Sequence, residues 1–113
     1  MSRGLQMLCD LKGCPFELLV DPDLVTASAY LAAEEAGAKV EEVSEHPMEV
    51  DGCSVVVLSW SLGLAVHTYP ELGRAAVDVY TLDHLGDPGL AVEALISGLQ
   101  ARQFSVTKRR RLA

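Results

Sequence analysis

The chain has 113 residues, of which half are apolar and 22% are charged, and its formal net charge is −7. This length and composition predict a single globular domain over residues 1–113 and argue against disorder. The acidic balance argues against a nucleic-acid partner, because phosphate contacts need a concentrated basic face. The basic run from Lys108 to Arg111 is expected to be a solvated tail.

Three further features bear on the compartment and on metals. No apolar run reaches the ~20 residues that a membrane span needs, and the first residues do not form a secretory signal. The three cysteines are odd in number and form no C-x-x-C pair, which indicates a reducing, cytoplasmic environment. Because the histidines and cysteines lack metal-ligand spacing, no metal site is expected.

The N-terminal third predicts a strand followed by helices. Residues 6–12 alternate imperfectly between apolar and polar and are expected to form a strand that ends at Gly13. Residues 15–20 are expected to form a short helical turn. Asp21-Pro22 is a strong helix start, because aspartate caps the first N–H groups and proline has no N–H to leave unpaired. The alanine-rich helix then ends at Gly37.

The middle of the chain predicts four strands. They are expected at residues 39–43, 54–59, 64–68 and 75–81. An irregular loop through His46-Pro47 follows the first of them. Turns are expected at Leu62-Gly63 and at residues 71–73.

The C-terminal third predicts a helix and a last strand. Asp87-Pro88 repeats the helix start, and an apolar stripe follows at Leu90, Ala94, Leu95 and Leu99. Residues 104–107 are expected to form a strand. The whole order predicts an α+β, two-layer fold with two helices on one face of a mostly antiparallel sheet. Since the other face would need cover, two sheets are expected to pair in a dimer.

The most specific motif lies between residues 52 and 81. It runs from Gly52-Cys53-Ser54 through a valine strand and a serine-bearing turn to His67-Thr68-Tyr69-Pro70-Glu71, and then to the strand Ala75-Ala76-Val77-Asp78. This arrangement resembles the bacterial S-adenosylmethionine decarboxylase proenzyme family, and weaker matches extend the resemblance over nearly the whole chain.

The resemblance implies an activity and a set of site residues. In the family, a serine cleaves the peptide bond before it and becomes a pyruvoyl group, which acts as the electron sink when S-adenosylmethionine is decarboxylated for polyamine biosynthesis. His67 matches the histidine that moves the proton during processing, and Ser54 matches an assisting serine. Tyr69 and Glu71 are implied to bind the substrate.

Two alignments place different residues at the position of the serine that would be processed. The family's Glu-Ser-His at the cut site is absent in that form. An ungapped match from Gly52 to His67 places Leu62 at the serine position, which would prevent processing. A second alignment with two compensating shifts makes Ser61 the nucleophile and the pyruvoyl precursor.

A second departure concerns the proton donor. The family's cysteine in this role corresponds to Leu82, which cannot donate a proton. His84, two positions later, is a candidate replacement.

Three functions follow from these matches. The first is a divergent, non-catalytic homologue that binds a ligand such as S-adenosylmethionine or a related amine, or that pairs with an active family member. The second is an active pyruvoyl-dependent decarboxylase with Ser61 as precursor and S-adenosylmethionine or an amino acid as substrate. The third is an enzyme that uses the same pocket without pyruvoyl. A homodimer or a heterodimer is expected.

Overall fold

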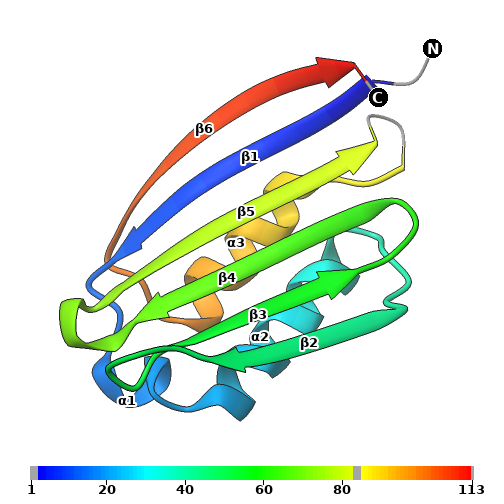
Figure 1. Ribbon diagram of the computed structural model, residues 1–113. Coiled ribbons are helices and arrows are strands. Elements are labelled where there is room, and N and C mark those ends of the chain that lie inside the picture. The colour runs from blue at the N-terminus through cyan, green and yellow to red at the C-terminus, as the bar shows by residue number, and fades with distance from the viewer. Residues whose placement is uncertain (1–2, 83–84, 113) are drawn as a thin grey trace.

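The computed structural model, which describes residues 3–82 and 85–112, contains one six-stranded antiparallel sheet with helices on one face (Figure 1). The elements in chain order are β1 (Arg3–Lys12), α1 (Phe16–Leu19), α2 (Pro22–Glu35), β2 (Glu42–Pro47), β3 (Cys53–Leu58), β4 (Leu62–Tyr69), the 3-10 helix η1 (Pro70–Leu72), β5 (Arg74–Leu82), α3 (Pro88–Gly98) and β6 (Gln103–Leu112). The strand order across the sheet is β2-β3-β4-β5-β1-β6. The predicted α+β, two-layer architecture is therefore confirmed.

Both long helices begin as the sequence predicts. Asp21 caps α2 by accepting the N–H groups of Asp23 and Leu24 at 3.1 and 3.2 Å. Asp87 caps α3 by accepting the N–H of Gly89 at 3.0 Å. In each helix a proline occupies the first turn, where its missing N–H costs nothing. No helix in the described residues is long and apolar enough to cross a membrane.

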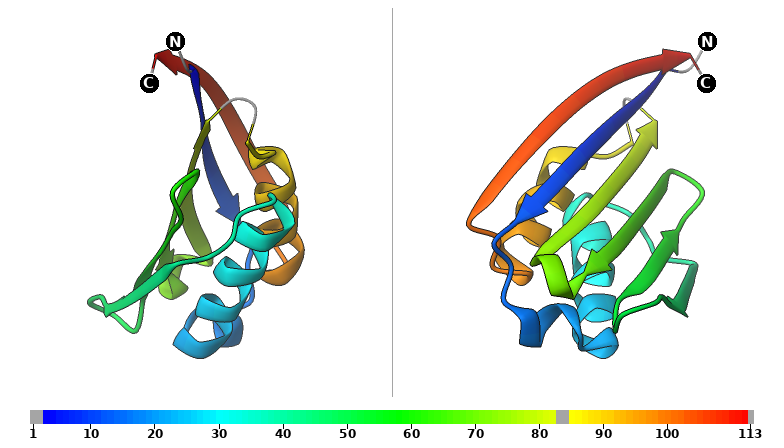
Figure 2. Two further views of the ribbon diagram at one scale, coloured as in Figure 1. Left: turned by 90° about the vertical axis from the view of Figure 1, so that its right-hand side faces the viewer. Right: turned by 60° about the vertical axis from the view of Figure 1, so that its left-hand side comes forward.

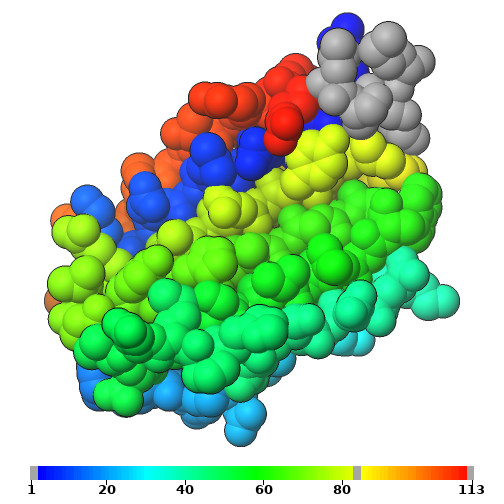
Figure 3. Space-filling view, in the orientation of Figure 1, coloured from blue at the N-terminus to red at the C-terminus, as the bar shows by residue number. Residues whose placement is uncertain are grey.

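The core lies between the sheet and the helices. Alternate strand residues face the helices and are buried, among them Val55, Val57, Leu64, Val66, Val77 and Val79. Seen from the side, the helices form a second layer behind the sheet, and the opposite face has no layer over it (Figure 2). Figure 3 shows the face of the sheet that points away from the helices, which we call the uncovered face. Its residues include Ser54, His67 and Tyr69.

The apolar stripe of α3 differs from the predicted one. Leu95 and Leu99 are buried as expected, but Leu90 is 42% exposed, and Ala91 and Val92 are buried instead. Successive helix residues lie about 100° apart, so the position next to the buried stripe already points toward solvent.

Both edge strands differ in their bounds from the prediction: residues 104–107 lie inside the longer β6, and β2 begins and ends later than residues 39–43. The second strand covers Glu42–Pro47, so the loop predicted through His46-Pro47 is a strand at the sheet edge, where a proline is tolerated. The basic run is part of β6, where Lys108 pairs with Met7 and Arg111 pairs with Gly4. It is therefore an edge strand and not a solvated tail.

The turn between β3 and β4 also lies earlier than predicted. It centres on Ser59, Trp60 and Ser61, and β4 already begins at Leu62. Gly63 is part of the ladder, paired with Leu58.

Candidate active site

Ser54 and His67 form a hydrogen-bonded pair on the uncovered face. The β3–β4 register sets them directly opposite each other, and Ser54 Oγ lies 2.7 Å from His67 Nδ1. Their chain neighbours Cys53, Val55 and Val66 are buried toward the helices, so strand alternation turns this pair to the other side. The two residues to which the family resemblance gives roles in processing thus lie in direct contact.

A third residue lies against the pair. Ser54 Oγ lies 2.9 Å from Met48 Sδ, which can only accept a hydrogen bond. Because the Ser54 hydroxyl has one hydrogen, it donates either to Met48 Sδ or to His67 Nδ1, and the tautomer of His67 decides which. The pair holds the imidazole of His67 through Nδ1 and leaves Nε2 outside this contact. Sequence reasoning missed Met48, since nothing in a loop methionine marks it as a partner of a serine.

The backbone under the pair is held by Thr68. The buried Thr68 Oγ1 accepts the Cys53 N–H at 2.9 Å, and it lies 3.3 Å from the Cys53 carbonyl oxygen. Gly52 is required beside it, because a Cβ at this position would collide with the carbonyl oxygen of Thr68. The sequence Gly52-Cys53-Ser54 is therefore fixed against the His67-Thr68 segment.

Ser61 lies in the hairpin turn, whose polar groups are largely paired. Ser59 N–H donates to the Leu62 carbonyl at 2.9 Å. Ser59 Oγ in turn accepts the N–H groups of Ser61 and Leu62 at 3.3 and 3.1 Å. The Ser61 hydroxyl lies 3.4 Å from Ser59 Oγ. The turn thus presents a serine hydroxyl beside a second hydroxyl.

The turn and the pair are separated within one chain. The ladder runs without interruption from Ser54↔His67 to Leu58↔Gly63, which is four positions further along the strands. At about 3.3 Å per residue this amounts to roughly 13 Å. The structure therefore brings Ser54 and His67 together but does not bring Ser61 to them in the same chain.

Leu62 occupies a buried place next to the turn. It is 4% exposed and lies opposite Thr81 of β5, on the side of the helices. Within the described residues, Thr81 Oγ1 is a buried side-chain oxygen without a hydrogen-bond partner.

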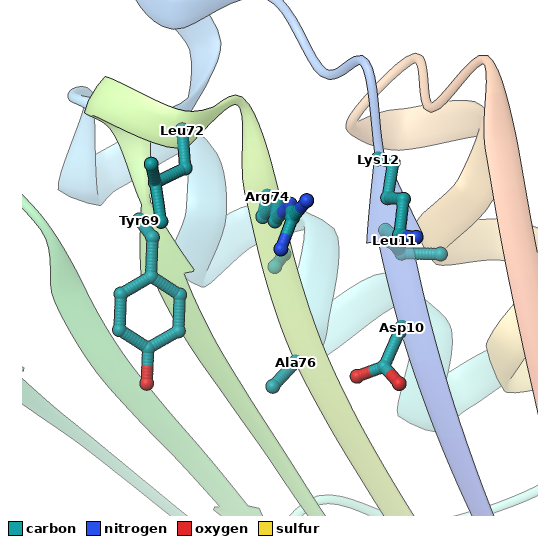
Figure 4. Close-up of a pocket in the computed structure, with 8 residues that line it drawn as sticks. Asp10, Leu11, Lys12, Tyr69, Leu72, Arg74 and Ala76 are labelled. Carbon is teal, nitrogen blue, oxygen red and sulfur yellow. The ribbon is translucent and has the colours of Figure 1, made fainter.

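A pocket of about 390 Å³ opens on the uncovered face near the pair. Asp10, Lys12, Tyr69 and Arg74 line it, together with Ala76, which lies beside His67 in the β4–β5 ladder. Figure 4 shows Arg74 between the ring of Tyr69 and the side chains of Asp10 and Lys12. Tyr69 thus lines a pocket, whereas Glu71 lies exposed on η1 and is not among its lining residues.

The three cysteines are buried and do not line this pocket. Burial raises the pKa of the Cys9 thiol to about 11, and the neighbouring carboxylate of Asp10 adds to the shift. Burial also raises the pKa values of Cys14 and Cys53. Leu82, at the place of the family's cysteine, ends β5. His84, the candidate replacement, lies outside the described residues.

Comparisons with known proteins agree on one family. A family profile described as S-adenosylmethionine decarboxylase matches residues 5–112. The chain is 39% identical to the S-adenosylmethionine decarboxylase proenzyme of Moorella thermoacetica, over 95% of this chain and 86% of that protein. It is 38% identical to the proenzyme of Geobacillus kaustophilus, over 90% and 83%. The crystal structure of the adenosylmethionine decarboxylase from Aquifex aeolicus superimposes with a TM-score of 0.86 at 27% identity, over 99% of this chain and 92% of that one.

Proposed function

Because the chain belongs to the S-adenosylmethionine decarboxylase family, we propose that it decarboxylates S-adenosylmethionine for polyamine biosynthesis after cleaving itself at Ser61. The single observation that carries this proposal is the Ser54–His67 pair at 2.7 Å, on the uncovered face beside a pocket. This contact holds the imidazole of His67 in one place, as a group that moves a proton in the cleavage chemistry must be held.

The chain's own residues supply the cleavage step. Ser61 Oγ attacks the carbonyl carbon of Trp60, the C–N bond breaks, and the Ser61 nitrogen becomes a free amine while an ester forms. His67 Nε2 removes the α-proton of Ser61, so that the Cβ–O bond breaks and the Trp60 carboxylate leaves. The enamine that remains takes up a proton at Cβ and becomes an imine, which water hydrolyses to a ketone with release of ammonia. The ketone left at residue 61 supplies the electron sink for loss of CO₂.

The separation of Ser61 from His67 within one chain leads us to include a homodimer in the proposal. If two copies pair through their uncovered faces with antiparallel β4 strands, the turn of one copy lies over the Ser54–His67 pair of the other. The apolar residues on this face, such as Val56, Leu58 and Ala65, would be covered at the same time.

The pocket is proposed to bind the substrate. The Tyr69 ring offers a face to the sulfonium cation, and the Asp10 carboxylate offers an acceptor to its amine. Glu71 is proposed to contribute from η1, at the rim next to Tyr69. Tyr69→Ala and Glu71→Ala are expected to weaken binding of S-adenosylmethionine in calorimetry, while Glu17→Ala on α1 serves as a control.

The intact mass of the purified chain tests the proposal. Wild type is expected as two fragments cut between Trp60 and Ser61, with a ketone in place of the amine on the second. Ser61→Ala is expected to stay whole. A wild-type chain that remains whole and releases no CO₂ from S-adenosylmethionine would show the proposal to be wrong.

Mixing two inactive variants tests the dimer. A Ser61→Ala chain keeps the Ser54–His67 pair, and a His67→Ala chain keeps Ser61. If sites form across the dimer, co-expression restores cleavage of the His67→Ala chain alone, at one site of each mixed dimer. If each chain acts within itself, mixing restores nothing, and the shared site is refuted.

A second candidate function is a non-catalytic partner of an active family member. Two observations favour it. Leu62, at the ungapped serine position, is buried beside the Thr81 hydroxyl, which has no partner within the described residues, and Leu82 stands at the place of the proton donor. Its expected signature is a whole chain that co-purifies with, and changes the activity of, a second family member. Release of CO₂ by the chain alone would exclude it.

A further inference from the structure

The turn that carries Ser61 is held by a residue outside the hairpin. Glu41 lies directly before β2, and its N–H donates to the Leu58 carbonyl at 3.0 Å, which sets it beside the end of β3. From there its Oε1 accepts the N–H of Trp60 at 2.8 Å. A carboxylate that accepts a backbone N–H makes a short, charge-assisted hydrogen bond.

Among the described residues, Glu41 is the one side chain that binds the backbone of Trp60. The N–H groups of Ser59, Ser61 and Leu62 are satisfied within the hairpin, by the Leu62 carbonyl and by Ser59 Oγ. Of the four N–H groups from Ser59 to Leu62, that of Trp60 is the one satisfied from outside the hairpin, by Glu41. The Trp60 side chain is 72% exposed, so core packing does not hold this residue either. The orientation of Trp60 therefore depends on Glu41.

This dependence bears on the bond that Ser61 would cleave. The carbonyl carbon under attack belongs to Trp60, the residue whose N–H Glu41 holds. A small rotation of Trp60 changes both the distance and the angle at which Ser61 Oγ meets that carbonyl, and small misplacements of reacting atoms cost large factors in rate.

We propose that Glu41 is a positioning residue for self-cleavage, an inference that rests on the proposed function. In the alignment that makes Ser61 the nucleophile, Trp60 stands where the family has glutamate. The carboxylate at this turn then comes from the residue before β2, and it binds the backbone of that same position.

Three variants test the role through the rate of cleavage of newly made chain. Glu41→Ala removes the acceptor and is expected to slow cleavage about tenfold, the size of one lost charge-assisted hydrogen bond. Glu41→Gln keeps an acceptor oxygen and is expected to stay within about threefold of wild type. The matched control is Glu42→Ala, which removes the adjacent exposed carboxylate and is expected to leave the rate unchanged.

A base at position 41 would behave differently from a positioning residue. Equal loss in Glu41→Gln and Glu41→Ala would assign a proton-transfer role and overturn the positioning proposal. A normal rate in Glu41→Ala would overturn it as well.

A second readout separates this proposal from the proposed function. In a Ser61→Ala background, which cannot be cut at Ser61, amide hydrogen exchange of Trp60 is measured by NMR. Glu41→Ala is expected to speed this exchange about tenfold and Glu42→Ala to leave it unchanged. Unchanged exchange in both variants would refute the Glu41 contact itself, whether or not wild type is cut. Faster exchange together with a wild type that stays whole would refute self-cleavage while leaving the contact in place.

Discussion

The two parts of the candidate site, the Ser54–His67 pair and the Ser59–Leu62 turn, are held in different ways. The pair lies inside a regular ladder, with buried neighbours on both strands and the Thr68 hydroxyl beneath it. The turn lies at the end of the hairpin, where its backbone is held by the Ser59 hydroxyl, by Glu41 and by the Leu82 N–H, which donates to the Ser61 carbonyl at 3.3 Å. The sheet therefore holds the proposed base in place, whereas the proposed nucleophile depends on a few polar contacts at the end of the hairpin.

The largest expected effect comes from breaking the pair. His67→Ala is expected to lower the rate of cleavage at Ser61 at least about 100-fold, since general base catalysis contributes that much. The control is His46→Ala. His46 lies opposite Ser54 in the β2–β3 ladder, and this variant is expected to be cut normally. The measurement is the intact mass over time after synthesis. Normal cleavage of the His67→Ala variant would show that the Ser54–His67 pair takes no part in cleavage at Ser61.

The next effect concerns the support beneath the pair. Thr68→Val removes the acceptor of the buried Cys53 N–H and is expected to lower the free energy of unfolding by about 1–3 kcal/mol. Urea denaturation followed by circular dichroism measures it. Thr107→Val, at an exposed position on β6, is the control. Equal stability of Thr68→Val and wild type would contradict the support assigned to this hydroxyl.

A threonine-to-valine substitution next to the turn, at Thr81, is expected to raise the free energy of unfolding instead of lowering it. Thr81 Oγ1 is buried without a partner within the described residues, so Thr81→Val replaces an unsatisfied hydroxyl with a methyl group of similar size. The free energy of unfolding is expected to rise by about 1 kcal/mol. Urea denaturation, as for Thr68→Val, measures this change in the free energy of unfolding. A loss of stability would mean that the Thr81 hydroxyl has a hydrogen-bond partner in solution.

The smallest effect is a pH dependence from a buried thiol. Cys9 has a folded pKa of about 11 against its ordinary 9.0, because burial disfavours the thiolate. Because the unfolded chain loses this thiol proton at a lower pH than the folded chain does, its contribution to the free energy of unfolding is complete below pH 9. That contribution is lost as the pH rises through 11. Wild type is therefore expected to lose more stability between pH 9 and 11 than Cys9→Ala does. Parallel pH profiles would show that Cys9 does not titrate in this way.

The sequence predicted the core strands better than the turn for a physical reason. Strand alternation and helix capping are local regularities, so the core strands and the capped helices could be foreseen. Ser54 and His67 were named from the family resemblance. The turn was placed at Leu62-Gly63 because glycine is a common turn residue. In the structure the Ser59 side chain closes the turn earlier, and no residue pattern marks that contact.

The contacts that come from other strands could not be foreseen at all. Glu41 reaches Trp60 only because β2 pairs with β3, and Met48 reaches Ser54 from the loop after β2. The edge strands themselves were misjudged because β2 and β6 carry mostly charged and polar residues, with little apolar alternation to identify them.

The basic run of β6 also restricts how two copies can meet. Lys108 to Arg111 lie along one outer edge of the sheet, and Glu42 and Glu45 lie along the other. A symmetric dimer that joined like edges would set arginine against arginine or glutamate against glutamate, and Pro47 further interrupts the β2 edge. The charged margins thus discourage the sheet from extending sideways into a second copy, and they leave its broad uncovered face as the surface through which copies can associate.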